Sequence, residues 1–268
     1  MLVIERSGYY AWAKHKPRKQ SLANESLDKK IISIFTSHSS RYGYPRITDE
    51  LHEQGEKCSR NRVFRRMIYL GLRAKGKKKF KVTTDSNHNL PVAPNLLGRN
   101  FHATAPNQKW VSDITYVWTD EGWLYLATVI DLYSRAVIGW SIQSTMTREL
   151  VCNALMMALW RREFPRDVLC HSDRGSQYCS EDYQKMLKRH GLICSMSRKG
   201  NCWDNAVAES FFHSIKTEMI YSERYATREI AKQSIFQYIE VYYNRIRRHS
   251  SIGSMAPMVF ENQCKFVA

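Results

Sequence analysis

The chain has 268 residues, enough for one large domain or two modest ones with real cores. Lysine and arginine outnumber aspartate and glutamate by 41 to 25, which gives a formal charge of +16 and a pI near 9.6. No apolar run is long enough to span a bilayer, so the composition favours a polyanionic partner over a membrane. The seven cysteines form no CxxC pair and no signal peptide is evident, so we expect reduced thiols and a cytoplasmic location.

The positive charge is concentrated in the first third of the chain. Residues 1–100 carry 21 Lys plus Arg against 8 acids, whereas residues 101–268 carry 20 against 17. Residues 83–106 are polar, contain several prolines and lack periodicity, which is typical of a linker. We therefore predict four segments: a basic helical region over 1–82, a linker over 83–106, an α/β core over 107–225, and a C-terminal helix with a basic tail over 226–268.

The first segment is predicted to be helical. Apolar residues recur at helical spacing over 21–35, Pro45 can open a second helix, and Ser59 can cap a third that runs to about Leu70. Two short helices joined by a tight turn indicate a helix-turn-helix-like DNA-binding region. The last helix is expected to turn Val63, Met67, Ile68 and Leu70 inward and to offer Arg60, Arg62, Arg65 and Arg66 to DNA. A helical bundle with a solvated basic face explains the same pattern.

From residue 109 the pattern changes to strands. Residues 110–118 and 123–142 are rich in aromatic and β-branched residues, which predicts three antiparallel strands. Two further short strands are expected, one ending before Asp173 and one over 192–196, and helices should begin near Thr147, Ser180, Asp204 and Thr227. The resulting order, β-β-β-α-β-α-β-α, predicts the α/β class, with a mixed five-stranded sheet flanked by helices.

Three carboxylates are candidates for a metal site: Asp113 in a strand, Asp173 at the end of a strand and Glu209 in a helix. An aspartate inside a strand is disfavoured, and Glu209 has apolar neighbours, so a bound cation would keep these acids ionised. One acid from each of three elements can hold two Mg²⁺ ions, which Mn²⁺ can replace, to cut and join phosphodiesters. The alternatives are a water-facing strand aspartate at 113 and a simple turn at 173.

Two other polar residues near these acids are interpreted as structural. Asp131 ends the second strand, and its neighbour Arg135 offers an ion pair. His171 is expected to be a satisfied structural histidine and not a metal ligand. Cys58 is the only cysteine before residue 152, so a zinc site built from paired His and Cys is not predicted.

Several motifs in this order resemble the second-frame (OrfB) transposases of bacterial insertion sequences, which are similar to retroviral integrases in having a ribonuclease-H-like core. The motifs are SDITYV, DLYSRAVIGWSI, HSDRGSQY, SRKGNCWDNAVAESFF and YNRIRRHSSIG, within residues 100–260. Residues 40–95 resemble the helix-turn-helix-like segment that precedes that core. The resemblance implies that Asp113, Asp173 and Glu209 are the catalytic DDE triad. It also implies that Lys216, two helical turns after Glu209, holds DNA near the metals, with Asn205 in reach of the same strand. A solvated lysine is the alternative for Lys216.

The resemblance further implies two successive reactions at one site. Hydrolysis of a phosphodiester at an element end exposes a 3′-hydroxyl, which then attacks another phosphate. The implied partners are double-stranded DNA of the element ends and target, further copies of this chain when active, and the upstream-frame product as a fusion or partner, in the bacterial nucleoid. A catalytically inactive DNA-binding regulator of transposition and a nuclease without strand transfer are the competing interpretations.

DNA binding by this chain is expected to weaken steeply with salt, because each lysine or arginine that neutralises a phosphate releases a counterion. The logarithm of the binding constant should fall linearly with the logarithm of the salt concentration, with a slope of about −0.9 for each phosphate contacted. Fluorescence anisotropy titrations of a labelled duplex at several salt concentrations measure this slope. A slope near zero would contradict the assignment of DNA as the partner.

Overall fold

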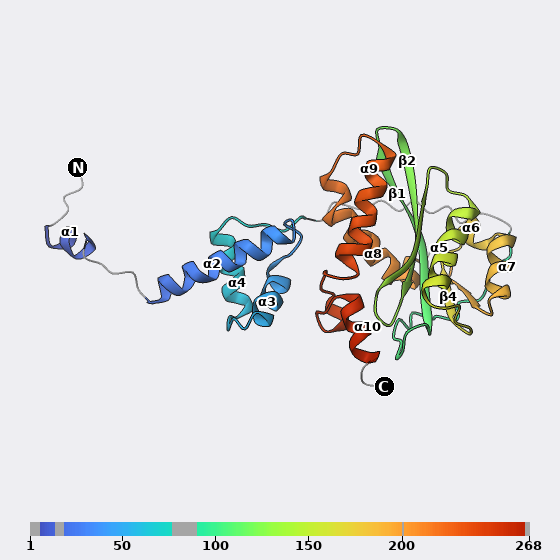
Figure 1. Cartoon of the computed structure of the whole chain (residues 1–268), viewed down its shortest axis with the longest axis horizontal. Coiled ribbons are helices and arrows are strands. Elements are labelled where there is room, and N and C mark those ends of the chain that lie inside the picture. The colour runs from blue at the N-terminus through green and yellow to red at the C-terminus, as the bar shows by residue number, and fades with distance from the viewer. Residues whose placement is uncertain (1–5, 14–18, 77–89, 200, 266–268) are drawn as a thin grey trace. The chain divides into compact units, whose positions relative to one another are not determined.

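The computed structural model describes residues 6–13, 19–76, 90–199 and 201–265, which form two compact units, Met1–Gly76 and Lys77–Ala268 (Figure 1). Within these described ranges, no helix is both long enough and apolar enough to cross a membrane. The five cysteines whose side chains are described are free thiols: Cys58, Cys152, Cys170, Cys179 and Cys194.

The smaller unit is helical. Its helices are α1 (Arg6–Ala13), α2 (Lys19–Ser37), α3 (Tyr44–Glu53) and α4 (Arg60–Tyr69). Pro45 lies in the first turn of α3, and the Ser59 hydroxyl accepts a hydrogen bond from the backbone N–H of Arg62 at 3.2 Å, so both predicted helix starts are confirmed. The unit buries one apolar side from each of α2, α3 and α4, formed by Leu27, Ile31, Ile47, Leu51, Val63 and Met67.

The prediction that Ile68 of α4 faces the core is wrong. Ile68 is 63% exposed, whereas Val63 and Met67 are buried and Leu70 is partly buried. At 3.6 residues per turn, positions 63 and 67 share one helix face, and position 68 lies about 100° around the axis from 67. The apolar character of Ile68 therefore does not reflect burial within this unit.

The larger unit contains a five-stranded mixed sheet in the order β3-β2-β1-β4-β5, which confirms the predicted fold class. Strand β1 pairs antiparallel with β2 and parallel with β4, while β2–β3 is antiparallel and β4–β5 is parallel. The strands are β1 (Lys109–Thr119), β2 (Gly122–Asp131), β3 (Val137–Gln143), β4 (Leu169–Ser172) and β5 (Ile193–Met196).

Helices cover both faces of this sheet. Figure 1 shows α5, α6 and α7 on one side and α8 and α9 on the other. The main core lies on the α5 side, where leucines and alanines of α5 pack against Trp110, Ala127 and Val129 of the sheet. The helices are α5 (Arg148–Arg161), α6 (Ser176–Cys179), α7 (Glu181–Arg189), α8 (Ala206–Glu218), α9 (Arg228–Phe236) and α10 (Pro257–Lys265).

The ends of the predicted helices differ from the structure in two places. The helix predicted from Asp204 begins as a 3-10 turn, Cys202–Asn205, before α8. The helix predicted from Thr227 to Tyr243 is α9 continued by a π-helix, Gln237–Tyr243. The Glu218 carboxylate at the end of α8 accepts a hydrogen bond from buried Arg247 at 2.7 Å, which fixes this helix to the chain beyond the π-helix.

The second half of the predicted linker is part of the larger unit. Leu97 is buried, and the backbone N–H groups of Leu96 and Leu97 donate to the Ser195 hydroxyl at 2.9 and 3.2 Å. This segment has no regular secondary structure and most of its residues are exposed, as its linker composition predicts, but buried Leu97 and side-chain hydrogen bonds attach it to the larger unit. Residues 83–89 lie outside the described part of the chain.

We expect Gly139→Ala to destabilise the larger unit by roughly 1–3 kcal/mol, the usual cost of overpacking a dense core. A Cβ at Gly139 would lie 2.2 Å from the Ala154 carbonyl oxygen and 2.8 Å from the Ala158 Cβ, so β3 and α5 would have to separate. Urea unfolding followed by tryptophan fluorescence measures the change. Gly76→Ala is the control, because its Cβ would meet nothing within 4 Å. Equal midpoints for both variants would contradict this packing.

Candidate active site

The pairing of β1 with β4 places two of the three candidate acids side by side. The last paired residues are Val111 and His171. Asp113 and Asp173 each follow a member of this pair by two residues, so continuing the parallel register past the end of β4 would put them level. Strand β4 ends at Ser172, and Asp173 therefore stands at the carboxyl end of its strand, where ligand sites in α/β sheets collect.

The surroundings of Asp113 disfavour its negative charge more than they stabilise it. Burial raises its pKa well above the ordinary value, and the negative charges of Asp173 and Glu209 raise it further. Two groups oppose this shift: the backbone N–H of Ile114, which donates to Oδ1 at 2.8 Å, and the ammonium of Lys216. A cation between these acids would remove the repulsion between them.

The turn after β4 orients Asp173. The backbone N–H of Gly175 donates to Asp173 Oδ1 at 2.9 Å, and a Cβ at Gly175 would lie only 3.0 Å from the same oxygen. Glycine therefore lets the backbone approach the carboxylate closely. Tyr178 lies buried nearby, and burial first and the Asp113 charge second raise the pKa of its hydroxyl well above the ordinary value.

Glu209 is placed less closely than the two aspartates. It is exposed in the first turn of α8, and partial burial raises its pKa. Its charge reaches Asp113, but the described residues contain no group of three or more His, Cys, Asp or Glu side chains that could hold a metal ion as they stand. The structure thus brings Asp113 and Asp173 together, while Glu209 is an exposed side chain whose charge still acts on Asp113.

The two residues predicted to hold DNA beside the acids are both buried. Lys216 is only 7% exposed, and its ammonium lies 4.9 Å from the centre of the Tyr116 ring. Burial lowers its pKa, and the Asp113 charge opposes that shift. Asn205 is buried and donates from Nδ2 to the Ser112 carbonyl at 3.1 Å, which ties the start of α8 to β1. Asn205 therefore holds α8 against β1, and Lys216 is a charge partner of Asp113, while contact of either residue with DNA stays a prediction.

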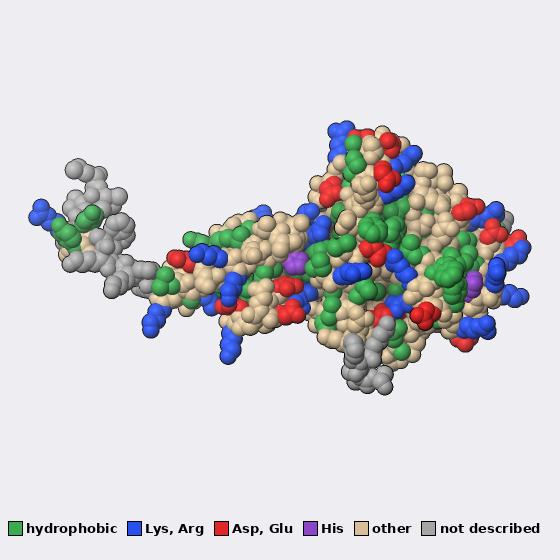
Figure 2. Space-filling view, viewed as in Figure 1, with side chains coloured by type: hydrophobic (Ala, Val, Ile, Leu, Met, Phe, Trp, Pro, Cys, Tyr) green, Lys and Arg blue, Asp and Glu red, His purple; other side chains and the backbone are tan. Residues whose placement is uncertain are grey.

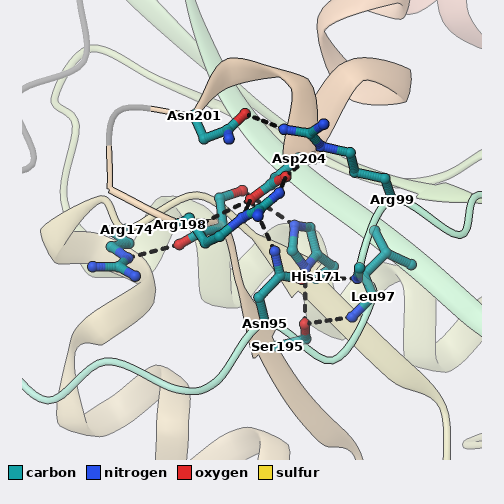
Figure 3. A network of polar contacts seen from close by, with 11 residues as sticks. Asn95, Leu97, Arg99, His171, Arg174, Ser195, Arg198, Asn201 and Asp204 are labelled. Carbon is teal, nitrogen blue, oxygen red and sulfur yellow. Dashed lines mark hydrogen bonds and ion pairs between the residues drawn. The ribbon is translucent and has the colours of Figure 1, made fainter.

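Asp204, a buried aspartate that was not predicted as a site residue, holds the segment just before α8 in a network of hydrogen bonds (Figure 3). Asp204 is fully buried and accepts hydrogen bonds from the Arg198 and Arg99 guanidinium groups at 2.8 and 2.9 Å and from the Asn95 amide at 2.8 Å. The hydrogen bond from Arg198 is the main reason that the pKa of Asp204 lies below its ordinary value. Its only sequence signal was its place at the start of the helix that bears Glu209.

The two residues interpreted as structural have structural contacts. His171 is buried between the hydroxyls of Ser195 and Ser197, at 2.9 and 3.1 Å, and burial lowers its pKa to about 4. Asp131 is buried and accepts from the backbone N–H groups of Asn107 and Tyr133 at 2.9 and 2.8 Å. The cation in its ion pair is Arg162, at 3.9 Å, and not the expected Arg135.

Three of the four α4 arginines predicted to contact DNA have partners inside the smaller unit. Arg60 pairs with Asp49 at 3.2 Å. Arg62 donates to Asn24 at 3.0 Å, and Arg66 donates from Nε to Asp28 at 2.7 Å and from Nη2 to its second oxygen. Arg65 is exposed. Arg62 and Arg66 therefore stabilise the packing of α4 on α2, which differs from the predicted role.

Comparison with known proteins decides the family. An integrase core domain family model matches residues 103–202, a second integrase core domain model matches 209–264, and an HTH-like domain model matches 21–80. Transposase InsF for insertion sequence IS3A of Escherichia coli K12 is 52% identical over 265 residues, covering 98% of this chain and 92% of that protein. The chain belongs to the IS3-type insertion-sequence transposases. A 31 kDa protein of insertion element IS600 from Shigella sonnei is 48% identical to this transposase, covering 97% and 96%.

The fold of the transposase also has solved counterparts. A cryo-EM structure of the simian T-cell lymphotropic virus intasome with the PP2A regulatory subunit B56γ aligns with a TM-score of 0.50 at 13% identity, covering 86% of this chain and 74% of that one. This likeness confirms the integrase-type fold. The predicted family and enzyme class, a DDE transposase, are thereby confirmed, and the alternative of a catalytically inactive regulator finds no support.

We expect Asp204→Asn to destabilise the larger unit by about 2–3 kcal/mol, because hydrogen bonds to charged groups are each worth about 1.5–3 kcal/mol. The pKa of Asp204 is lowered in the folded state, so its contribution is complete at neutral pH and is lost as pH falls below the unfolded value of about 3.9. Urea unfolding at several pH values measures both effects. Asp120→Asn, which removes an exposed pair with Arg224, should cost under about 0.5 kcal/mol. Equal losses of unfolding free energy in the two variants would contradict the conclusion that the burial of Asp204 makes its hydrogen bonds stabilising.

Proposed function

We propose that this transposase cleaves and joins DNA at the ends of an insertion sequence, with Asp113, Asp173 and Glu209 as its catalytic metal ligands. The observation that carries the proposal is that Asp113 on β1 and Asp173 just after β4 each follow the paired Val111 and His171 by two residues, with the pKa of Asp113 raised by burial and by its neighbours' charges. Repulsion between such acids destabilises the charged site, and a bound cation would offset that repulsion.

The donor set fits a hard divalent cation. Carboxylate oxygens are the ligands that Mg²⁺ and Mn²⁺ prefer, and the two aspartates come from adjacent strand positions. Asp113, Asp173 and Glu209, the last from the first turn of α8, would hold the ions. When bound, two divalent ions would supply activation of the entering oxygen and stabilisation of the leaving one for in-line attack on a phosphodiester.

The chain's other residues prepare this site. Gly175 holds Asp173 in one orientation, and Asn205 fixes the start of α8 against β1 beside Asp113. Lys216 supplies a buried positive charge that opposes the rise in the pKa of Asp113. The Tyr178 hydroxyl stays protonated because its pKa is raised, so a covalent protein intermediate through it is not expected.

The substrates and partners follow from the same proposal. Double-stranded DNA of the element ends and of the target would supply the phosphodiesters, and joining two ends requires at least two copies of the active chain. The upstream-frame product would act as a fusion or partner that adds end recognition. The reaction would take place in the bacterial cytoplasm at the nucleoid.

We expect Asp113→Asn, Asp173→Asn and Glu209→Gln each to lower cleavage and joining by at least about 10³-fold, the order of effect seen when a preorganised electrostatic group is removed. The assay incubates the full chain with Mg²⁺ or Mn²⁺ and labelled duplexes carrying the element's ends. Nicked and joined products are then separated on denaturing gels.

Glu229→Gln is the matched control, because Glu229 is an exposed acid on α9 that pairs with Lys232 and is not among the charges that shift the pKa of Asp113. It should retain the parent's rate. Triad variants that cut and join as fast as the parent would contradict the site assignment. Products that are nicked and never joined would instead favour a nuclease without strand transfer.

A further inference from the structure

The outward face of α4 carries a different set of residues from the arginines that the sequence favoured. Asn61, Phe64, Arg65 and Ile68 are exposed and recur at i, i+3, i+4 and i+7, so they lie on one face of the helix. Phe64 is 45% exposed and Ile68 is 63% exposed. Within the described part of the chain, the side chains of Asn61 and Arg65 make no hydrogen bond or ion pair with another residue. We call these four residues the α4 stripe.

The other arginines of α4 all have partners within the smaller unit: Arg60 makes an exposed pair with Asp49, and Arg62 and Arg66 are partly buried. The guanidinium of Arg66 holds both carboxylate oxygens of Asp28 and lies 4.1 Å from the centre of the Tyr69 ring. Arg62 is bound to Asn24. A ligand that approaches the outer face of α4 therefore meets the stripe first, with one forked cation, one amide and two apolar side chains.

We infer that the α4 stripe reads base edges in the major groove of DNA, an inference that rests on the proposed function and names residues for it. Helix α4 follows α3 after a tight turn at Gly55, the position of the recognition helix in helix-turn-helix proteins. Arginine pairs with guanine O6 and N7, asparagine pairs with adenine N6 and N7, and apolar side chains contact the thymine methyl group. The stripe presents all three types of group on one helix face.

Charge favours DNA over a protein as the occupant of this face. Helix α4 contains four arginines and no acid, and residues 1–76 carry 16 Lys plus Arg against 7 acids. Figure 2 shows hydrophobic side chains at the surface of this unit among Lys and Arg side chains. The centre of a protein interface is depleted in charge, whereas Arg65 lies between Phe64 and Ile68 in the middle of the stripe. A polyanion with apolar methyl groups in its groove matches this combination.

The test selects DNA with the full chain, in the absence of divalent ions, from duplexes with a randomised centre. The parent should enrich a motif that contains a fixed guanine and a fixed adenine. Arg65→Ala should lose the guanine preference and Asn61→Ala the adenine preference, each by roughly 5- to 150-fold, the discrimination given by one bidentate contact. Both side chains are exposed, so these variants should fold, and circular dichroism melting checks this.

Two matched variants separate base reading from general attraction. Arg65→Lys keeps the charge and removes the planar fork, so it should lose the guanine preference while keeping the salt slope of the parent. Arg73→Ala removes an exposed cation outside the stripe, and it should weaken binding to all sequences about equally.

Several outcomes would overturn the inference. A parent that enriches no motif, or stripe variants that enrich the parent's motif unchanged, would show that the stripe does not read bases. Phe64→Ser with Ile68→Ser that keeps the motif and lowers the oligomeric mass in sedimentation would make this face a protein contact. A chain that selects no motif and still cuts and joins DNA leaves the proposed function standing, whereas a chain that selects the motif and cuts nothing contradicts the proposed function alone.

Discussion

The parallel pairing of β1 with β4 is the constraint on which the site depends. It brings residues sixty positions apart into the same register, so Asp113 and Asp173 are neighbours because Val111 and His171 are paired. The two carboxylates repel each other, and the free energy that holds them together comes from the packing of both strands in one core. A fold that holds two acids together at the end of a strand can keep them ionised only with help from cations, and Lys216 supplies part of it.

Helix α8 is positioned by polar contacts at both ends, and this determines where Glu209 stands. At its start, Asn205 donates a hydrogen bond to the backbone of β1, and Asp204 accepts hydrogen bonds from Arg99 and Arg198. At its end, Glu218 forms an ion pair with buried Arg247. Buried hydrogen-bonded networks of this kind favour one arrangement, because breaking any member leaves a polar group unsatisfied. Glu209 itself is exposed, so the scaffold of α8 is fixed while the carboxylate remains accessible.

Most of the fold could be predicted from local sequence, and the site only in part. The strand patterns predicted all five strands and a mixed sheet, although not the order of the strands within it, and Pro45, Ser59 and Ser180 marked helix starts through their own backbone and capping chemistry. The packed segment at 95–99 and the burial of Asn205 and Lys216 could not be predicted, because their partners are about a hundred positions away in the sequence. The exposure of Ile68 was missed because hydrophobicity alone does not distinguish core from binding surface.

Positive charge in this chain serves two purposes that composition cannot separate. Arg66 and Arg247 each form a buried ion pair with an acid of the protein, and these pairs hold helices in place. A side chain already engaged in a buried pair cannot turn to DNA without leaving its partner unpaired, which costs more than a surface contact returns. The cations that remain for a polyanion are therefore the exposed ones. On α4 both Arg60 and Arg65 are exposed, but Arg60 pairs with Asp49, whereas the Arg65 side chain has no such pair among the described residues. The neighbours of Arg65 on its helix face are an amide and two apolar side chains.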